Sequence, residues 1–82
     1  IDFYADWCEP CKKMAPYLEA MKTEMADSVI IVRISADKNQ GIAKTLKVDE
    51  LPTLLLFKNK ATTWTHTGFI EKDELVKKIN SY

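Results

Sequence analysis

The sequence predicts an α/β fold in the order β-α-β-α-β-β-α, with a central mixed sheet flanked by helices. Short runs of β-branched and aliphatic residues alternate along the chain with segments whose apolar residues recur at helical spacing. The last two runs are separated only by a short turn, which is typical of a hairpin. The chain has 82 residues, and we expect one domain over residues 1–82.

The first strand is predicted at Ile1–Ala5, where only Asp2 interrupts the apolar residues. Pro10 suits the first turn of the following helix because its missing N–H is not needed there. Pro16 lies inside the helical pattern and is expected to kink the helix without ending it. One face of this helix is apolar and is expected to enter the core through Met14, Tyr17, Leu18, Met21 and Met25.

The second strand is predicted at Val29–Ser35, a nearly continuous apolar run of the kind buried on both faces, interrupted by Arg33. Because a helix joins the first two strands, they are expected to be parallel. A short helix follows, with Asn39 as its expected N-cap and an apolar side formed by Ile42, Ala43 and Leu46.

The C-terminal part is predicted to contain an antiparallel hairpin and a final helix. Its strands are expected at Thr53–Lys58 and Ala61–Thr67, with a turn at Asn59-Lys60 and a break at Gly68. The helix is expected at Glu71–Asn80, with its inward face formed by Leu75, Val76 and Ile79.

Composition argues against several classes of partner. Lysine plus arginine and aspartate plus glutamate both number 12, so the formal net charge is zero. No basic stripe predicts binding to nucleic acid or to an anionic membrane, and apolar runs such as Leu54–Phe57 are too short to span a bilayer. No signal peptide is visible. The chain begins as if at the end of a strand, so we expect residues upstream of Ile1 to have been removed or omitted.

Cys8 and Cys11 form a C-x-x-C sequence between the first strand and the first helix. Two thiols at this spacing can close a disulfide within one turn. A helix N-terminus favours a thiolate through its free N–H groups and its dipole. Beside a βαβ pattern, this sequence predicts thiol–disulfide exchange. The alternatives are a structural disulfide or half a zinc site, but zinc usually needs four ligands and His66 is the only histidine. We predict no metal and no cofactor.

Three segments together resemble the thioredoxin family. Asp2-Phe3-Tyr4-Ala5, with Trp7-Cys8-x-Pro10-Cys11-Lys12 and Ala15-Pro16, is similar to the active-site segment of that family. Leu51-Pro52-Thr53 and the strand after it are similar to its cis-proline loop and hairpin, and Gly68 matches the glycine that ends the hairpin. The resemblance covers essentially the whole chain and implies a thioredoxin-like fold that lacks the N-terminal strand and helix of the family.

The resemblance implies the catalytic roles of Cys8, Cys11 and Asp2. Cys8 would be the exposed nucleophile that forms a mixed disulfide with a target, and Cys11 would resolve it. Asp2 would lie behind Cys11 and help to move its proton, through water; the alternative is an exposed aspartate at a frayed chain start. Arg33 aligns with a family lysine near that acid, and it either pairs with Asp2 or lies on the strand rim.

The resemblance also implies a substrate-binding rim. Pro52 would be a cis proline that brings the Leu51 backbone beside Cys8, the alternative being an ordinary trans proline. Target proteins would dock as a short added strand on an apolar rim formed by Trp7, Leu51, Pro52, Thr67, Gly68 and Phe69. Trp7 has a core position as its alternative, whereas Trp64 is expected to pack in the hairpin and His66 to lie on the strand surface.

Two features depart from the family pattern. The residues between the cysteines are Glu9-Pro10, where the best-known thioredoxins carry Gly-Pro. A negative Glu9 directed at the sulfurs would oppose thiolate formation and favour a more reducing pair. This dipeptide resembles some membrane-tethered relatives that reduce disulfides in cytochrome c maturation. Lys60 stands where the hairpin turn commonly has a glycine.

The leading hypothesis is therefore a monomeric protein-disulfide reductase that acts on disulfide-containing proteins. It would be recycled by an upstream electron donor such as a thioredoxin reductase, and a cytoplasmic location is expected. The first alternative is a dedicated extracytoplasmic thiol reductase, periplasmic if an upstream signal or anchor was removed. The second is a thioredoxin-like peptide-binding module without turnover.

Overall fold

The computed structural model describes all residues from Ile1 to Tyr82 and contains one four-stranded mixed sheet. The strands are β1 (Asp2–Tyr4), β2 (Arg33–Ser35), β3 (Thr53–Lys58) and β4 (Ala61–Thr67), arranged in the order β2-β1-β3-β4. β1 is parallel to β2 and antiparallel to β3, and β3 is antiparallel to β4. The predicted element order, parallel first pair and antiparallel hairpin are confirmed.

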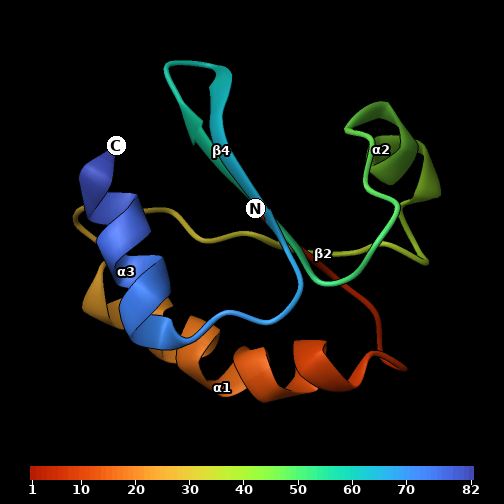
Figure 1. Cartoon of the computed structure of the whole chain (residues 1–82), viewed down its shortest axis with the longest axis horizontal. Helices are drawn as coiled ribbons and strands as arrows, with labels where there is room; N and C mark the ends of the chain where they lie inside the picture. Colours follow the sequence, from red (N-terminus) through yellow and green to blue (C-terminus); the bar gives the residue numbers. More distant parts are fainter.

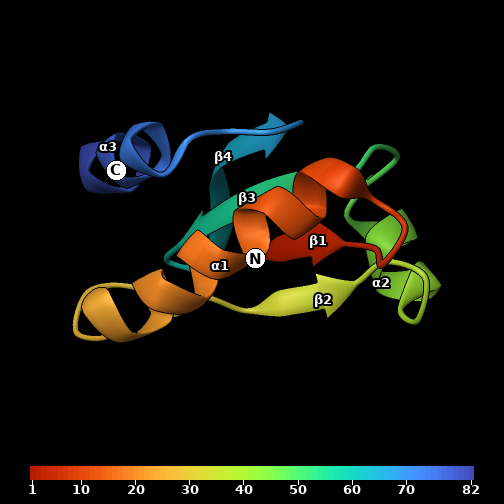
Figure 2. The same ribbon diagram turned by 90° about the horizontal axis from the view of Figure 1, so that it is seen from below.

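The helices cover both faces of this sheet. α1 (Glu9–Glu24) and α3 (Lys72–Ser81) lie together on one side, and α2 (Gln40–Thr45) lies on the other (Figure 1). Figure 2 shows α1 crossing in front of the sheet, over β3 and the start of β1. Because successive strand residues point to opposite faces, Leu54 packs against α1 and α3, whereas its neighbour Leu55 packs with Phe3 against α2.

α1 provides most of the larger core. Met14, Leu18 and Met21 are buried on one face of the helix, as their spacing predicts, and they pack with Leu75 of α3. The helix continues through Pro16. The Tyr17 hydroxyl donates a hydrogen bond of 2.5 Å to the carbonyl of Ile70, which ties α1 to the segment that leads into α3.

The prediction of a long second strand buried on both faces is wrong. Only Arg33–Ser35 form β2, and Ile30 is 86% exposed. β2 lies at the edge of the sheet and pairs on one side only, with β1. Because β1 begins at Asp2, which pairs with Arg33, the residues before Arg33 have no strand partner.

The N-cap of α2 and the turn between β3 and β4 show two local details that the sequence did not predict. Asn39 is at the N-cap position of α2, but its side chain makes no capping hydrogen bond and instead donates to the Ser35 carbonyl. The hairpin turn places Asn59 at φ 55° and Lys60 at φ 67°, the left-handed conformations that a tight two-residue turn requires.

Candidate active site

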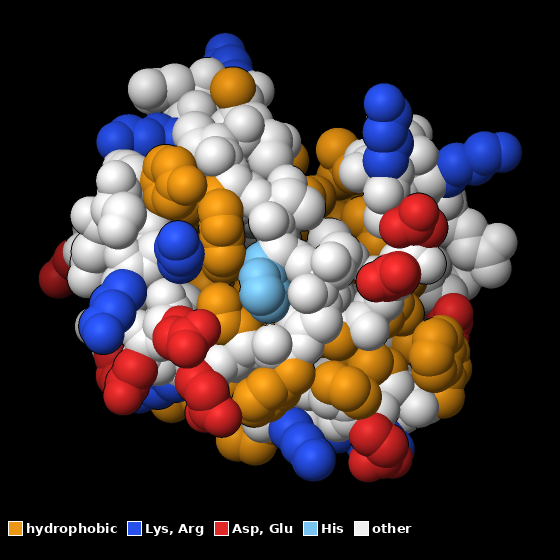
Figure 3. All heavy atoms as spheres, viewed as in Figure 1, with side chains coloured by type: hydrophobic (Ala, Val, Ile, Leu, Met, Phe, Trp, Pro, Cys, Tyr) orange, Lys and Arg blue, Asp and Glu red, His pale blue; other side chains and the backbone are white.

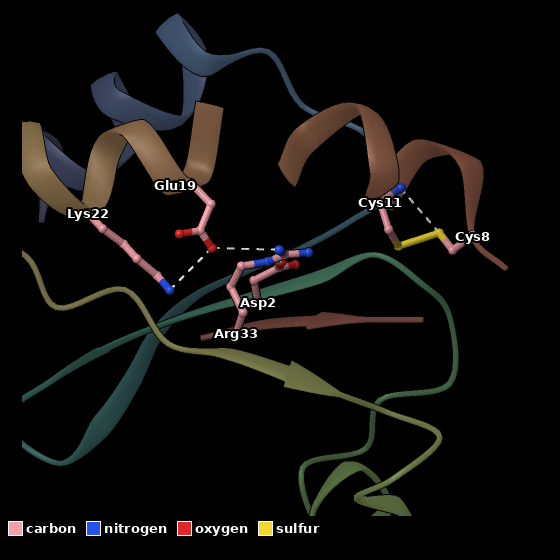
Figure 4. Close-up of polar contacts among 6 residues, drawn as sticks. All are labelled: Asp2, Cys8, Cys11, Glu19, Lys22 and Arg33. Carbon is pink, nitrogen blue, oxygen red and sulfur yellow. Dashed lines mark hydrogen bonds and ion pairs between the residues drawn. A yellow bond between two sulfur atoms is a disulfide. The ribbon is translucent and has the colours of Figure 1, made fainter. Parts of the chain in front are cut away.

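The two cysteines lie at the N-terminus of α1. Cys8 is the N-cap residue, with extended backbone angles, and it forms a disulfide with Cys11 across a Cα–Cα distance of 5.2 Å (Figure 4). The preceding turn closes through a hydrogen bond from the Cys8 N–H to the Ala5 carbonyl. Pro10 stands within the first turn of the helix, where no hydrogen bond is lost. The dithiol is therefore placed by a strand, a turn and a helix start that follow one another directly.

The Cys8 sulfur replaces the oxygen of an ordinary N-cap side chain. The backbone N–H of Cys11 donates to Cys8 Sγ at 3.3 Å. A thiolate on Cys8 would receive the same hydrogen bond and would also lie at the positive end of the helix dipole. The geometry thus favours negative charge on Cys8 in particular.

Glu9 has less influence on this charge than the sequence suggested. Its side chain is 74% exposed and pairs with Lys12 Nζ at 3.3 Å. Because an exposed, paired carboxylate is screened by water and by its partner, its repulsion of a thiolate on Cys8 is weak.

The sulfurs are more enclosed than the resemblance implied. Cys8 is 4% exposed and Cys11 is 3% exposed, so the expected exposed nucleophile is nearly covered when the disulfide is closed. Both cysteines form a buried cluster with Ala5, and Tyr4 and Leu51 pack against it. Access to Cys8 therefore depends on the residues immediately around this cluster.

Asp2 is a buried acid on the same side of the sheet as the disulfide. Figure 4 shows its side chain and the two cysteines in the layer between α1 and the strands. Asp2 is 3% exposed, which excludes the alternative of an exposed residue at a frayed end. Burial raises the pKa of Asp2, and the adjacent Arg33 opposes this rise without cancelling it. Its Oδ1 atom is buried and accepts no hydrogen bond.

Arg33 pairs with Asp2, one of the two positions expected for it. Its Nε donates to Asp2 Oδ2 at 3.1 Å. The guanidinium also lies over the Tyr4 ring and, at 3.8 Å, beside Glu19, which in turn pairs with Lys22 (Figure 4). Sequence reasoning missed Glu19, because nothing in the spacing of these residues links the middle of α1 to the start of β2.

The Pro52 loop lies beside the cysteine cluster. The Leu51–Pro52 peptide bond is cis, as the resemblance implied. The Pro52 carbonyl accepts a hydrogen bond of 2.8 Å from the Gly68 N–H, so Pro52 and Gly68 are neighbours. The Pro52 side chain is fully buried, so its ring offers no open surface to a target.

The remaining rim residues are not all assembled around the sulfurs. Trp7 is 67% exposed, so it is not a core residue, and its Nε1 donates to Asp37 Oδ2 at 2.9 Å. Thr67 pairs with Thr53 at the end of the hairpin. Phe69 is 43% exposed and does not belong to the cysteine cluster. Asp37 was not identified from the sequence. It lies 30 residues from Trp7, and no sequence motif links the two residues.

No group of three or more histidine, cysteine, aspartate or glutamate side chains has the arrangement of a metal site. None of the helices combines the length and the apolar character needed to cross a membrane.

Comparison with known proteins agrees with this geometry. The family model described as Thioredoxin matches residues 1–81. The chain is 42% identical to thioredoxin of Bacillus subtilis over 81 residues, which cover 99% of this chain and 78% of that protein. It is 40% identical to thioredoxin of Haemophilus influenzae, over 100% of this chain and 77% of that protein.

A solved structure shows the same fold. The crystal structure of thioredoxin NaTrxh from Nicotiana alata superposes with a TM-score of 0.89 at 40% identity, over 98% of this chain and 68% of that one. The thioredoxin-like fold and the redox reading of Cys8 and Cys11 are confirmed. The chain belongs to the thioredoxin family and is a thiol–disulfide oxidoreductase, an enzyme that reduces disulfides in proteins.

Proposed function

We propose that Cys8 attacks the disulfide of a target protein and that Cys11 completes the reduction. The observation that carries this assignment is the hydrogen bond from the Cys11 N–H to Cys8 Sγ at the start of α1. It favours a thiolate on Cys8, and the thiolate is the nucleophile in disulfide exchange.

Two exchanges make up one turnover. The Cys8 thiolate attacks one target sulfur; the target S–S bond breaks, the mixed disulfide forms, and the first target thiolate takes up a proton. The Cys11 thiolate then attacks Cys8 Sγ; the Cys8–Cys11 disulfide forms, and the second target thiolate leaves. Two electrons pass to the target, and an upstream reductase must return two electrons to the enzyme.

Asp2 is proposed to accept the Cys11 proton, through water. Its buried Oδ1 has no hydrogen-bond partner, which leaves one oxygen free to accept a proton. Arg33 is proposed as a positioning residue, because its bond to Oδ2 fixes the orientation of the carboxylate. Glu9 and Pro10 support the site by shaping the first turn of α1.

Target binding is proposed on the surface beside Cys8. Trp7 and Leu51 would contact target side chains, Phe69 would add apolar surface, and the backbone near Pro52, Thr67 and Gly68 would hold an extended target segment. We propose that the enzyme acts as a monomer of one domain, with proteins as substrates and a thioredoxin reductase as the electron donor.

Single-cysteine variants test the order of attack. Cys11→Ser should accumulate a stable mixed disulfide with a protein substrate, because Cys8 can attack but the second exchange is blocked. Cys8→Ser should form no such adduct and should lose turnover. Mass spectrometry under non-reducing conditions detects the adduct, and each variant is the matched control for the other. Trapping through Cys11 in the Cys8→Ser variant would overturn the assignment.

Adduct trapping and the reduction of a general substrate together separate the alternatives. A binding module without turnover would hold its partner equally well with either cysteine replaced, and it would form no adduct. A dedicated extracytoplasmic reductase would ignore general substrates such as insulin, which the leading proposal expects the enzyme to reduce. Glu9, the residue that prompted that alternative, gives it little support because it is exposed and paired with Lys12.

A further inference from the structure

An open groove of about 660 Å³ adjoins the dithiol on the α2 side. Trp7 and Leu51 form the wall nearest the cysteines, and Ala43 and Val48 belong to its apolar lining. Leu51 also packs against the buried cluster of Cys8 and Cys11, and Trp7 directly precedes Cys8. A segment of a target protein bound in this groove would therefore have its disulfide close to Cys8.

The lining of the groove is also acidic. Asp49 and Glu50 line it, both are exposed, and neither forms an ion pair. Lys44 is the one basic residue in the lining. Asp37 adds a further carboxylate beside the groove, where it binds Trp7. Acidic side chains accordingly lie next to apolar ones on the side of the molecule that carries α2 (Figure 3).

We propose that this groove selects target segments that carry a lysine or arginine beside the disulfide cysteine. The proposal rests on the function proposed above and names its substrate class. Long basic side chains fit such a surface because the aliphatic stem covers apolar residues while the charged end stays in water. Here the stem would lie on Leu51 and Val48, and the cation would meet Asp49 and Glu50.

The position of the acids along the chain strengthens the argument. Glu50 and Leu51 directly precede Pro52, on the loop proposed to hold the extended target backbone. Since side chains of an extended segment alternate in direction, a residue close to the target cysteine would point into the groove. Exposed charges of this kind act mainly on the association rate and on the choice of partner, and their effect falls as salt is added.

Two matched peptides test the proposal. Each contains one disulfide, and they differ only in a lysine or a glutamate next to the attacked cysteine. The full chain should reduce the lysine peptide about threefold to tenfold faster, the range expected for one or two exposed charge pairs. Each rate is divided by the rate at which the same protein reduces 2-hydroxyethyl disulfide, which is small and neutral.

Two charge-matched double variants complete the design. Asp49→Asn with Glu50→Gln should abolish the preference for the lysine peptide. Asp73→Asn with Glu74→Gln, which removes the same charge from the exposed side of α3, should retain it. Equal reduction of both peptides by the unmodified chain, or a preference that survives the groove substitutions, overturns the inference. Failure to reduce even the small disulfide overturns the proposed function, and this inference with it.

Discussion

Asp2 carries a cost in stability beside the role in proton transfer that we propose for it. The buried carboxylate pairs with Arg33 through one oxygen, while the other oxygen accepts no hydrogen bond. Burial raises its pKa above the ordinary value of 3.8. The folded chain therefore binds this proton more tightly than the unfolded chain does. With respect to Asp2, stability is greatest below pH 3.8 and falls as pH rises through the folded pKa.

Replacing Asp2→Asn should consequently stabilise the protein at neutral pH. The gain expected is on the order of 1 kcal/mol, the usual size for relief of a desolvated polar group. Denaturant unfolding followed by circular dichroism over a series of pH values measures it, and the fall in stability above pH 3.8 should become shallower. Asp27→Asn, at an exposed site, should leave that slope unchanged. A less stable Asp2→Asn protein would mean that the Arg33 pair outweighs the burial.

At the scale of single residues, the sequence identified candidate functional residues more successfully than it identified their contacts. The C-x-x-C spacing and the helix start indicated the chemistry of Cys8 and Cys11 directly. The pairing of Asp2 with Arg33 followed only from a resemblance, because it depends on the register that places these two residues opposite each other. Asp37 and Glu19 were missed for the same reason: their contacts arise from the packing of distant segments.

At the scale of elements, the success of a prediction depended on the neighbours of each segment. β3 and β4 were predicted with their observed bounds, because a hairpin supplies its own pairing partner. Val29–Ser35 was predicted as one long buried strand, yet only three residues pair, because the strand beside it has only three. The apolar pattern indicates that a segment favours a strand. It does not indicate how long the neighbouring strand is, and that length limits how many residues can pair.

The hairpin turn allows a test of how much a left-handed backbone conformation at a non-glycine residue reduces stability. Lys60 has a φ of 67°, a region that glycine adopts without the steric cost that other residues carry. Lys60→Gly should therefore stabilise the chain by about 0.5–1 kcal/mol after the greater flexibility of unfolded glycine is counted.

Thermal unfolding followed by circular dichroism measures this change. Lys77→Gly is the matched control, because it removes the same side chain from the interior of α3 and should cost about 1 kcal/mol. An unfolding temperature for Lys60→Gly at or below that of the unmodified chain would contradict the expected relief.

At the scale of the whole molecule, two clusters on opposite faces of the sheet hold the fold together. Met21 belongs to the larger cluster and is 0% exposed, whereas Ile30, also apolar, is 86% exposed at the margin of the sheet. Both residues looked equally suited to a core in the sequence. The difference comes from the arrangement of the helices, which covers one position and leaves the other open.

Substitutions at these two positions should change the free energy of unfolding by different amounts. Met21→Ala should reduce the free energy of unfolding by about 2–5 kcal/mol, because it leaves a cavity beneath α1. Ile30→Ser should change it by about 0.5 kcal/mol or less. Denaturant titration of the oxidised proteins measures both values, and a large loss on Ile30→Ser would show that this residue packs in solution.

The contact between Tyr17 and Ile70 has a consequence for how the enzyme behaves in alkali. Burial, and to a lesser extent the negative charges of Asp2 and Glu71, raises the pKa of Tyr17 to about 12. A phenol can donate its hydrogen bond to the Ile70 carbonyl only while it keeps its proton. Ordinary thiols ionise near pH 8.5, far below that point. The hydrogen bond that joins α1 to the chain before α3 therefore stays intact across the pH range in which a free thiol ionises.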